Sequence, residues 1–91
     1  MVKHIILWVL KDYSKEEKQK IKSDIKENLE GLKGKIDGLL EIKVYTEGLE
    51  SSNADLMLDS SFENEEALKT YATHKEHVYV ADTFVRPFTA Q

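Results

Sequence analysis

The stretch VKHIILWVL, residues 2–10, decides the fold class. It is rich in β-branched and apolar residues and too short for a stable helix, so it predicts a buried strand. Because successive side chains of a strand point to opposite sides, it has two bulky faces. One face carries Val2, His4, Ile6, Trp8 and Leu10, and the other carries Ile5, Leu7 and Val9. A single layer of helices in a chain of 91 residues can cover only one face, so we expect the second face to meet another copy of the protein, in a homodimer.

A helix is predicted after this strand. Ser14 and Glu17 have the spacing of a capping box, which places the start of the helix near Lys15. Apolar residues then recur every three or four positions and form one stripe. These residues are Ile21, Ile25, Leu29 and Leu32. Gly34 is expected to end the helix, because glycine tolerates the left-handed cap conformation.

The middle of the chain predicts a β-hairpin. Residues 40–47 alternate, with Leu40, Ile42 and Val44 on one side. Residues 55–62 alternate again, and residues 48–54, rich in serine and small polar residues, are expected to form the flexible connection between the two strands.

A second helix and a last strand complete the predicted order. Asn64 can cap the helix, and the inward-facing residues are expected to be Leu68, Tyr71 and Ala72. The chain stays compatible with helix to about Asp82, and residues 84–89 predict a short strand at a sheet edge, since Pro87 cannot donate to a ladder. The order β-α-β-β-α-β predicts an α+β ferredoxin-like fold with a four-stranded antiparallel sheet covered by helices on one face.

Composition excludes several classes of function. Residues 1–91 suit a single domain, and 13 basic against 17 acidic residues give 13 − 17 = −4, which argues against nucleic acid as a partner. The chain has no cysteine, so disulfides and thiolate chemistry are excluded. The longest apolar run, Ile5 to Leu10, is far shorter than the roughly 20 residues that span a bilayer. No membrane partner is expected, and the cytoplasm is the expected location.

Three motifs give the chain a resemblance to a known family. They are Val2-Lys3-His4, the segment GKIDGL at residues 34–39, and the ordered set Phe62, Leu68, Tyr71, His74 and His77. Together they resemble the stress-responsive A/B barrel (Dabb) family over nearly the whole chain. The resemblance implies a dimeric α/β barrel in which two ferredoxin-like sheets face each other. Asp37 and Lys75 stand where the family usually has proline.

The resemblance also implies a candidate site. A few members are plant polyketide cyclases that use a tyrosine and a histidine for acid/base work, and Tyr71 and His77 match those positions. His4 matches a further pocket histidine. Residues six apart on one uninterrupted helix are turned about 120° from each other, so this pair can converge only if the chain bends near His74. The ligand-contacting residues are expected to be His4, Trp8 and His74.

Three interpretations of function follow. The first is a homodimer of stress-associated but unspecified role, with an internal, mainly apolar pocket that suits a small apolar or aromatic carbonyl compound. The second is a cofactor-independent enzyme in which His77 is the base and Tyr71 the hydrogen-bond donor. The third is a purely structural role: self-association with a filled interior and no ligand. In this case Tyr71 is a core residue, and His74 and His77 bond backbone carbonyls around the bend. A metal site is not expected, because His74 and His77 lack a clear third ligand, and no sequence motif predicts a cofactor.

Overall fold

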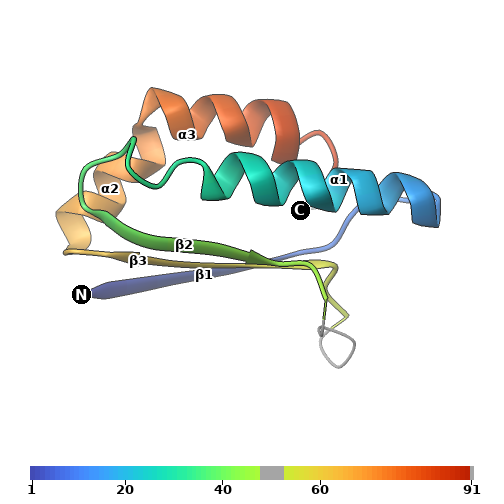
Figure 1. Ribbon diagram of the computed structural model, residues 1–91, viewed down its shortest axis with the longest axis horizontal. Helices are drawn as coiled ribbons and strands as arrows, with labels where there is room; N and C mark the ends of the chain where they lie inside the picture. Colours follow the sequence, from blue (N-terminus) through green and yellow to red (C-terminus); the bar gives the residue numbers. More distant parts are fainter. Residues whose placement is uncertain (48–52, 91) are drawn as a thin grey trace.

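The computed structural model describes residues 1–47 and 53–90 as one layer of helices on one layer of strands (Figure 1). The elements, in order, are β1 (Val2–Trp8), α1 (Lys15–Glu30), β2 (Leu39–Tyr45), β3 (Leu56–Phe62), α2 (Glu65–Thr73), α3 (Lys75–Val80) and the π-helix η2 (Ala81–Val85). Helices α1 and α3 lie on the same side of the sheet, and no element of the described residues covers its other side (Figure 1). The ferredoxin-like arrangement expected from the sequence is confirmed.

Within residues 1–47 and 53–90 the sheet has three strands in the order β1-β3-β2, and both pairings are antiparallel. The predicted fourth strand over residues 84–89 is wrong. The chain remains helical to Val85, and the amides of Phe88 and Thr89 both donate to the Val85 carbonyl, at 3.1 Å each. With those donors used in a turn, only an isolated bridge between Leu10 and Thr89 is left where a fourth strand would pair.

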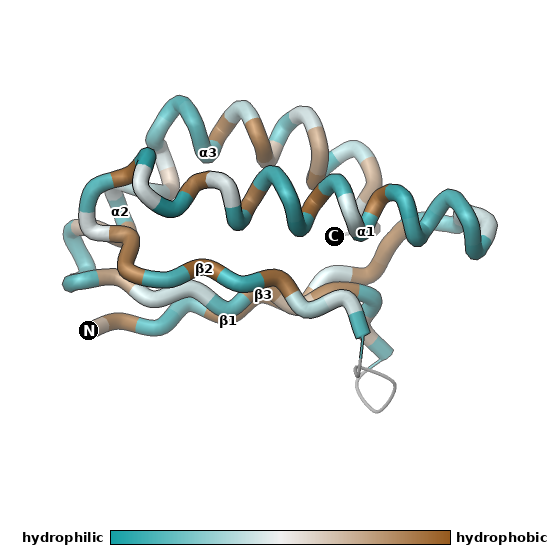
Figure 2. The backbone as a smooth tube through the Cα atoms, in the orientation of Figure 1, coloured by the Kyte–Doolittle hydropathy of each residue, from teal (hydrophilic) through white to brown (hydrophobic). Residues whose placement is uncertain are grey.

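Helix α1 begins as its cap predicts. The Ser14 hydroxyl accepts from the Glu17 amide at 3.1 Å, while the Glu17 carboxylate accepts from the Ser14 amide at 3.2 Å. Hydrophobic residues recur along the helix (Figure 2), and those of the predicted stripe are buried. The helix ends at Glu30, earlier than the predicted Gly34, because the amides of Leu32 and Lys33 donate to carbonyls only three residues earlier, those of Leu29 and Glu30. Gly34 has a φ of 87° and lies in the turn that follows.

The hydrophobic core lies between the sheet and the helices, and β3 runs through its centre. Leu56, Leu58 and Phe62 of β3 are buried there, against α1 and Tyr71 of α2. Ala72, predicted to point inward, is exposed, because the helical turn directs it away from the side that carries Tyr71. Strand β2 starts and ends slightly earlier than predicted, and residues 48–52 of the predicted connection lie outside the described part of the chain.

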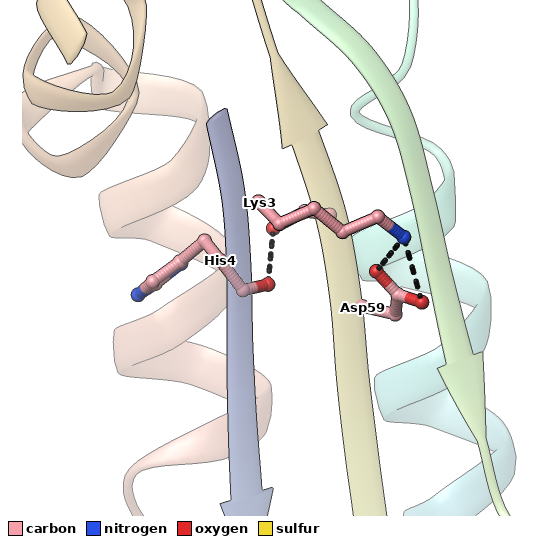
Figure 3. Close-up of polar contacts among 4 residues, drawn as sticks. Lys3, His4 and Asp59 are labelled. Atoms are coloured by element: carbon pink, nitrogen blue, oxygen red, sulfur yellow. Dashed lines mark hydrogen bonds and ion pairs between the residues drawn. The ribbon is translucent and has the colours of Figure 1, made fainter. Parts of the chain in front are cut away.

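The outer face of β1 is uncovered. Ile5, Leu7 and Val9 are 56%, 50% and 39% exposed, respectively, as the alternation of residues 2–10 predicts for a face that no helix of the same chain covers. Beside them, Lys3 pairs with Asp59 of β3 at 3.1 Å on the surface of the sheet (Figure 3). None of the helices in the described part of the chain combines the length and the apolar composition that spanning a bilayer requires.

Candidate functional site

The chain bends sharply at His74, between α2 and α3. His74 has φ −65° and ψ 133°, an extended conformation between two helical segments. Its Nδ1 accepts a hydrogen bond from the Glu76 amide at 3.1 Å, so the imidazole itself caps the start of α3. The helix therefore breaks at the extended backbone of His74, and the imidazole caps the helix that follows, although Lys75 replaces the family's proline.

This bend brings Tyr71 and His77 together. Their ring centroids lie 4.1 Å apart with the planes tilted by 35°, and the Tyr71 ring also packs on Phe62 at 5.0 Å. Tyr71 is only 2% exposed, and its hydroxyl has no hydrogen-bond partner in the described residues. Burial raises the pKa of Tyr71 to about 12, so the phenol stays protonated at neutral pH. It can therefore donate a hydrogen bond but cannot serve as a base.

His77 is held in its neutral form. Burial lowers the pKa of His77 below 6.5, and the charges of Arg86 and His4 act in the same direction. A hydrogen bond with the Ala72 backbone and the charge of Asp82 oppose this shift without cancelling it. The His77 Nδ1 is buried and has no partner among the described residues. A neutral imidazole of this kind can accept a proton or a hydrogen bond.

A pocket of about 200 Å³ lies between the inner face of β1 and the segment α3–η2; we call it the β1–η2 pocket. Its lining residues are Ile6, Trp8, His77, Ala81, Val85, Arg86 and Thr89. Most of the wall is apolar; its polar groups are the His77 imidazole, the Arg86 guanidinium, the Trp8 indole N–H and the Thr89 hydroxyl. Of the predicted site residues, Trp8 and His77 line it.

The other predicted site residues lie outside this lining. The His4 ring points away from the Lys3–Asp59 pair (Figure 3), and its Nδ1 is buried with no partner within residues 1–47 and 53–90. The His4 backbone carbonyl accepts from the Ser60 hydroxyl at 3.0 Å, which fixes β1 to β3. Tyr71 lies against His77, and His74 is occupied as a cap. The predicted roles of these residues toward a substrate or ligand stay predictions.

Sequence reasoning missed one wall of the pocket, formed by η2 and the turn after it. Ala81 and Val85 follow His77 at intervals of four residues, which is the spacing of a continued helix face. That signal was available, but assigning residues 84–89 to a strand obscured it.

A second hollow of about 210 Å³ lies beside α1; we call it the α1 groove. Its lining residues are Tyr13, Glu17, Lys20, Ile21, Asp24 and Phe88, none of which was a predicted site residue. Within the described residues no three His, Cys, Asp or Glu side chains are grouped so as to hold a metal ion.

Comparisons with known structures agree with this architecture. A dimeric protein of unknown function with a ferredoxin-like fold from Bacteroides fragilis is 32% identical, with a TM-score of 0.88 over 98% of this chain and 86% of its own. A protein from Arabidopsis thaliana is 22% identical, with a TM-score of 0.77 over 100% of this chain and 87% of its own. A Dabb family protein from Mesorhizobium loti is 19% identical, with a TM-score of 0.73 over 98% and 86% of the two chains. The last two likenesses show the fold alone.

The family follows from the sequence as a whole. No curated protein of known function matches the chain. The model of the stress-responsive A/B barrel domain matches residues 2–91. The chain therefore belongs to the Dabb family, the stress-responsive A/B barrel proteins.

Proposed function

We propose that the protein is a homodimer that binds a small, mainly apolar carbonyl compound in the β1–η2 pocket of each protomer. The observation that carries this proposal is an apolar pocket with a neutral imidazole, His77, in its wall. A carbonyl-bearing ligand would place its apolar body against Ile6, Trp8 and Val85. Its carbonyl group would face His77 and Arg86. Ligand sites of this kind are mostly apolar with a few polar groups that fix orientation.

The volume of the pocket limits the size of the ligand. At about 200 Å³ it is smaller than the roughly 300 Å³ at which drug-sized pockets begin. It is larger than the cavity of about 150 Å³ that suffices for benzene. We therefore infer a ligand with a single ring, or an acyclic compound of similar volume.

Dimerisation is supported by the uncovered face of β1. Ile5, Leu7 and Val9 form an apolar row on that face and are exposed in the isolated protomer. The relative from Bacteroides fragilis, 32% identical over nearly the whole chain, is dimeric. Pairing the uncovered faces of two protomers would bury both apolar rows. Each protomer would then be a single domain that forms one half of a two-sheet barrel.

A thermal-shift screen with single-ring aromatic and carbonyl compounds tests ligand binding. A ligand present at about 100 times its Kd stabilises the folded state by about 2.7 kcal/mol, which raises the melting temperature measurably. Ala81→Leu adds side-chain volume to the pocket wall, so it should abolish the shift. Ala72→Leu, at an exposed position of α2, is the matched control and should retain it. Equal shifts for the two variants would contradict binding in this pocket.

Acid/base catalysis is the second candidate, favoured by the contact between His77 and Tyr71. His77 would remove a proton from a carbon next to the ligand carbonyl. Tyr71, which packs on His77 outside the pocket lining, would donate its hydrogen bond once entry of the ligand makes its buried hydroxyl accessible. General acid/base groups contribute about 10²- to 10⁴-fold to a rate. Once a turnover substrate is found, His77→Ala and Tyr71→Phe should each lower the rate at least about 100-fold. Unchanged rates would leave binding as the function.

A further inference from the structure

Arg86 differs from every other basic residue of the chain. It is the one arginine among 13 basic residues, and it lines the β1–η2 pocket. Its side chain is 66% exposed, so the guanidinium lies at the open side of the pocket, where it pairs with Asp82. Among the described residues that line the pocket, none is acidic. Arg86 is therefore the permanent charge that a bound molecule would meet.

The π-helix η2 brings Arg86 to this position. The Arg86 amide donates to the carbonyl of Ala81, five residues earlier, at 2.8 Å. In an α-helix, residues five apart are turned about 140° from each other, so Arg86 would point away from the face that carries Ala81. The wider π-turn absorbs one extra residue and aligns the two. Single π-turns within helices occur frequently at functional sites.

The charge of Arg86 reaches His77 on the pocket wall, where the charge of its partner Asp82 opposes it. The positive charge of Arg86 is one of the causes that lower the pKa of His77. The guanidinium is thus close enough to influence a group on the pocket wall. A negative charge held beside Arg86 would have the opposite influence on the same imidazole.

We propose that Arg86 is a specificity-determining residue that selects ligands carrying a carboxylate, with the apolar body of the ligand held by Ile6, Trp8 and Val85. This inference rests on the proposed binding function of the β1–η2 pocket. The planar guanidinium matches the geometry of a carboxylate and can bind both of its oxygens. The ligand class is a small monocarboxylate with one apolar group of about the size of a benzene ring.

The existing partner of Arg86 leaves room for this role. Asp82 and Arg86 are both about half-exposed or more, and ion pairs of this kind contribute little stability. The guanidinium has five N–H donors, so it can contact a ligand carboxylate while it keeps Asp82. Asp82 would also hold the guanidinium near the pocket before the ligand arrives.

Titration calorimetry with benzoate and benzamide tests the inference, because the two probes have nearly the same shape and differ in charge. We expect the wild-type protein to bind benzoate about tenfold more tightly than benzamide, as one charge-assisted contact at a partly exposed site allows. Arg86→Gln should remove this preference, so that the variant binds benzoate and benzamide with equal affinity. Arg86→Lys should keep part of it. Lys75→Gln, which removes a charge from an exposed residue of α3 outside the pocket, should leave it intact.

The two probes separate failure of the inference from failure of the proposed function. If the wild type binds both probes equally, or if Arg86→Gln still prefers benzoate, Arg86 does not select the ligand, although the pocket binds one. If neither probe binds, the single-ring ligand proposed for the pocket is wrong, and the role of Arg86 is overturned with it.

Discussion

Replacing Tyr71 by phenylalanine removes one oxygen atom from the most buried part of the candidate site. The Tyr71 hydroxyl is inaccessible and has no hydrogen-bond partner among the described residues. The ring would keep its contacts with Phe62 and His77, whose centroids lie 5.0 Å and 4.1 Å away. The substitution therefore removes a desolvated polar group and leaves the packing in place.

The expected change is a gain in stability. A buried polar group without a partner costs about 1–3 kcal/mol, so Tyr71→Phe should raise the free energy of unfolding by roughly 1 kcal/mol or more. The variant should also lose part of the alkaline sensitivity of the wild type. Because the pKa of Tyr71 is raised to about 12 in the folded protein, the stability associated with its neutral form is present below about pH 10 and is lost as the pH rises toward 12.

Urea unfolding followed by circular dichroism measures this gain. Tyr79→Phe is the control, because Tyr79 is 59% exposed and its change should stay within about 0.5 kcal/mol. If Tyr71→Phe is less stable than the wild type by more than this margin, the hydroxyl has a stabilising partner and the reasoning fails. A gain would mean that the chain retains a destabilising hydroxyl, which is typical of residues kept for function.

Three further predictions follow from the dimer, the buried imidazole and the helix break. Light scattering should give the wild type about twice the 10.5 kDa mass of the chain, and Leu7→Glu the mass of one chain, because burying an unpaired charge in the dimer interface is costly. Thr70→Glu, at an exposed position of α2, should leave the dimer mass unchanged. Because the pKa of His77 is lowered in the folded state, its contribution to stability is present above about pH 6.5 and is lost as the pH falls below that value. In urea unfolding, the free energy of unfolding should therefore fall less on acidification for His77→Gln than for the wild type. His74→Ala should lower the free energy of unfolding by about 0.5–2 kcal/mol through loss of the α3 cap, and His74→Asn should recover most of it; equal stabilities of the two variants would rule out the capping role.

The sequence predicted the orientation of β1 correctly because strand alternation depends only on the pleat of the backbone. Ile5 and Leu7 are exposed, while Ile6 and Trp8 face the helices, as a period of two requires. The capping box of α1 was equally readable, since both of its hydrogen bonds join residues three positions apart. Both features depend only on residues close together in the sequence, so the sequence is enough to predict them.

The wrong predictions concern segments whose conformation is set by hydrogen bonds that the local residue pattern does not specify. The apolar residues at 84–89 are compatible with a strand, but the amides of Phe88 and Thr89 donate to the Val85 carbonyl and form a turn. The contact between Tyr71 and His77 depends on the bend at His74, and family spacing alone does not specify the extended backbone there. Arg86 was missed as a pocket residue because a π-turn has no composition by which it can be recognised.

The most direct test of the central claim is to map where a small ligand binds. Two-dimensional NMR of the ¹⁵N-labelled protein, titrated with benzamide, reports the backbone amides that respond. Binding in the β1–η2 pocket predicts saturable changes at Trp8, His77 and Val85, and their loss in Ala81→Leu. Changes confined to the α1 groove, around Tyr13, or changes that persist in Ala81→Leu, would contradict the account.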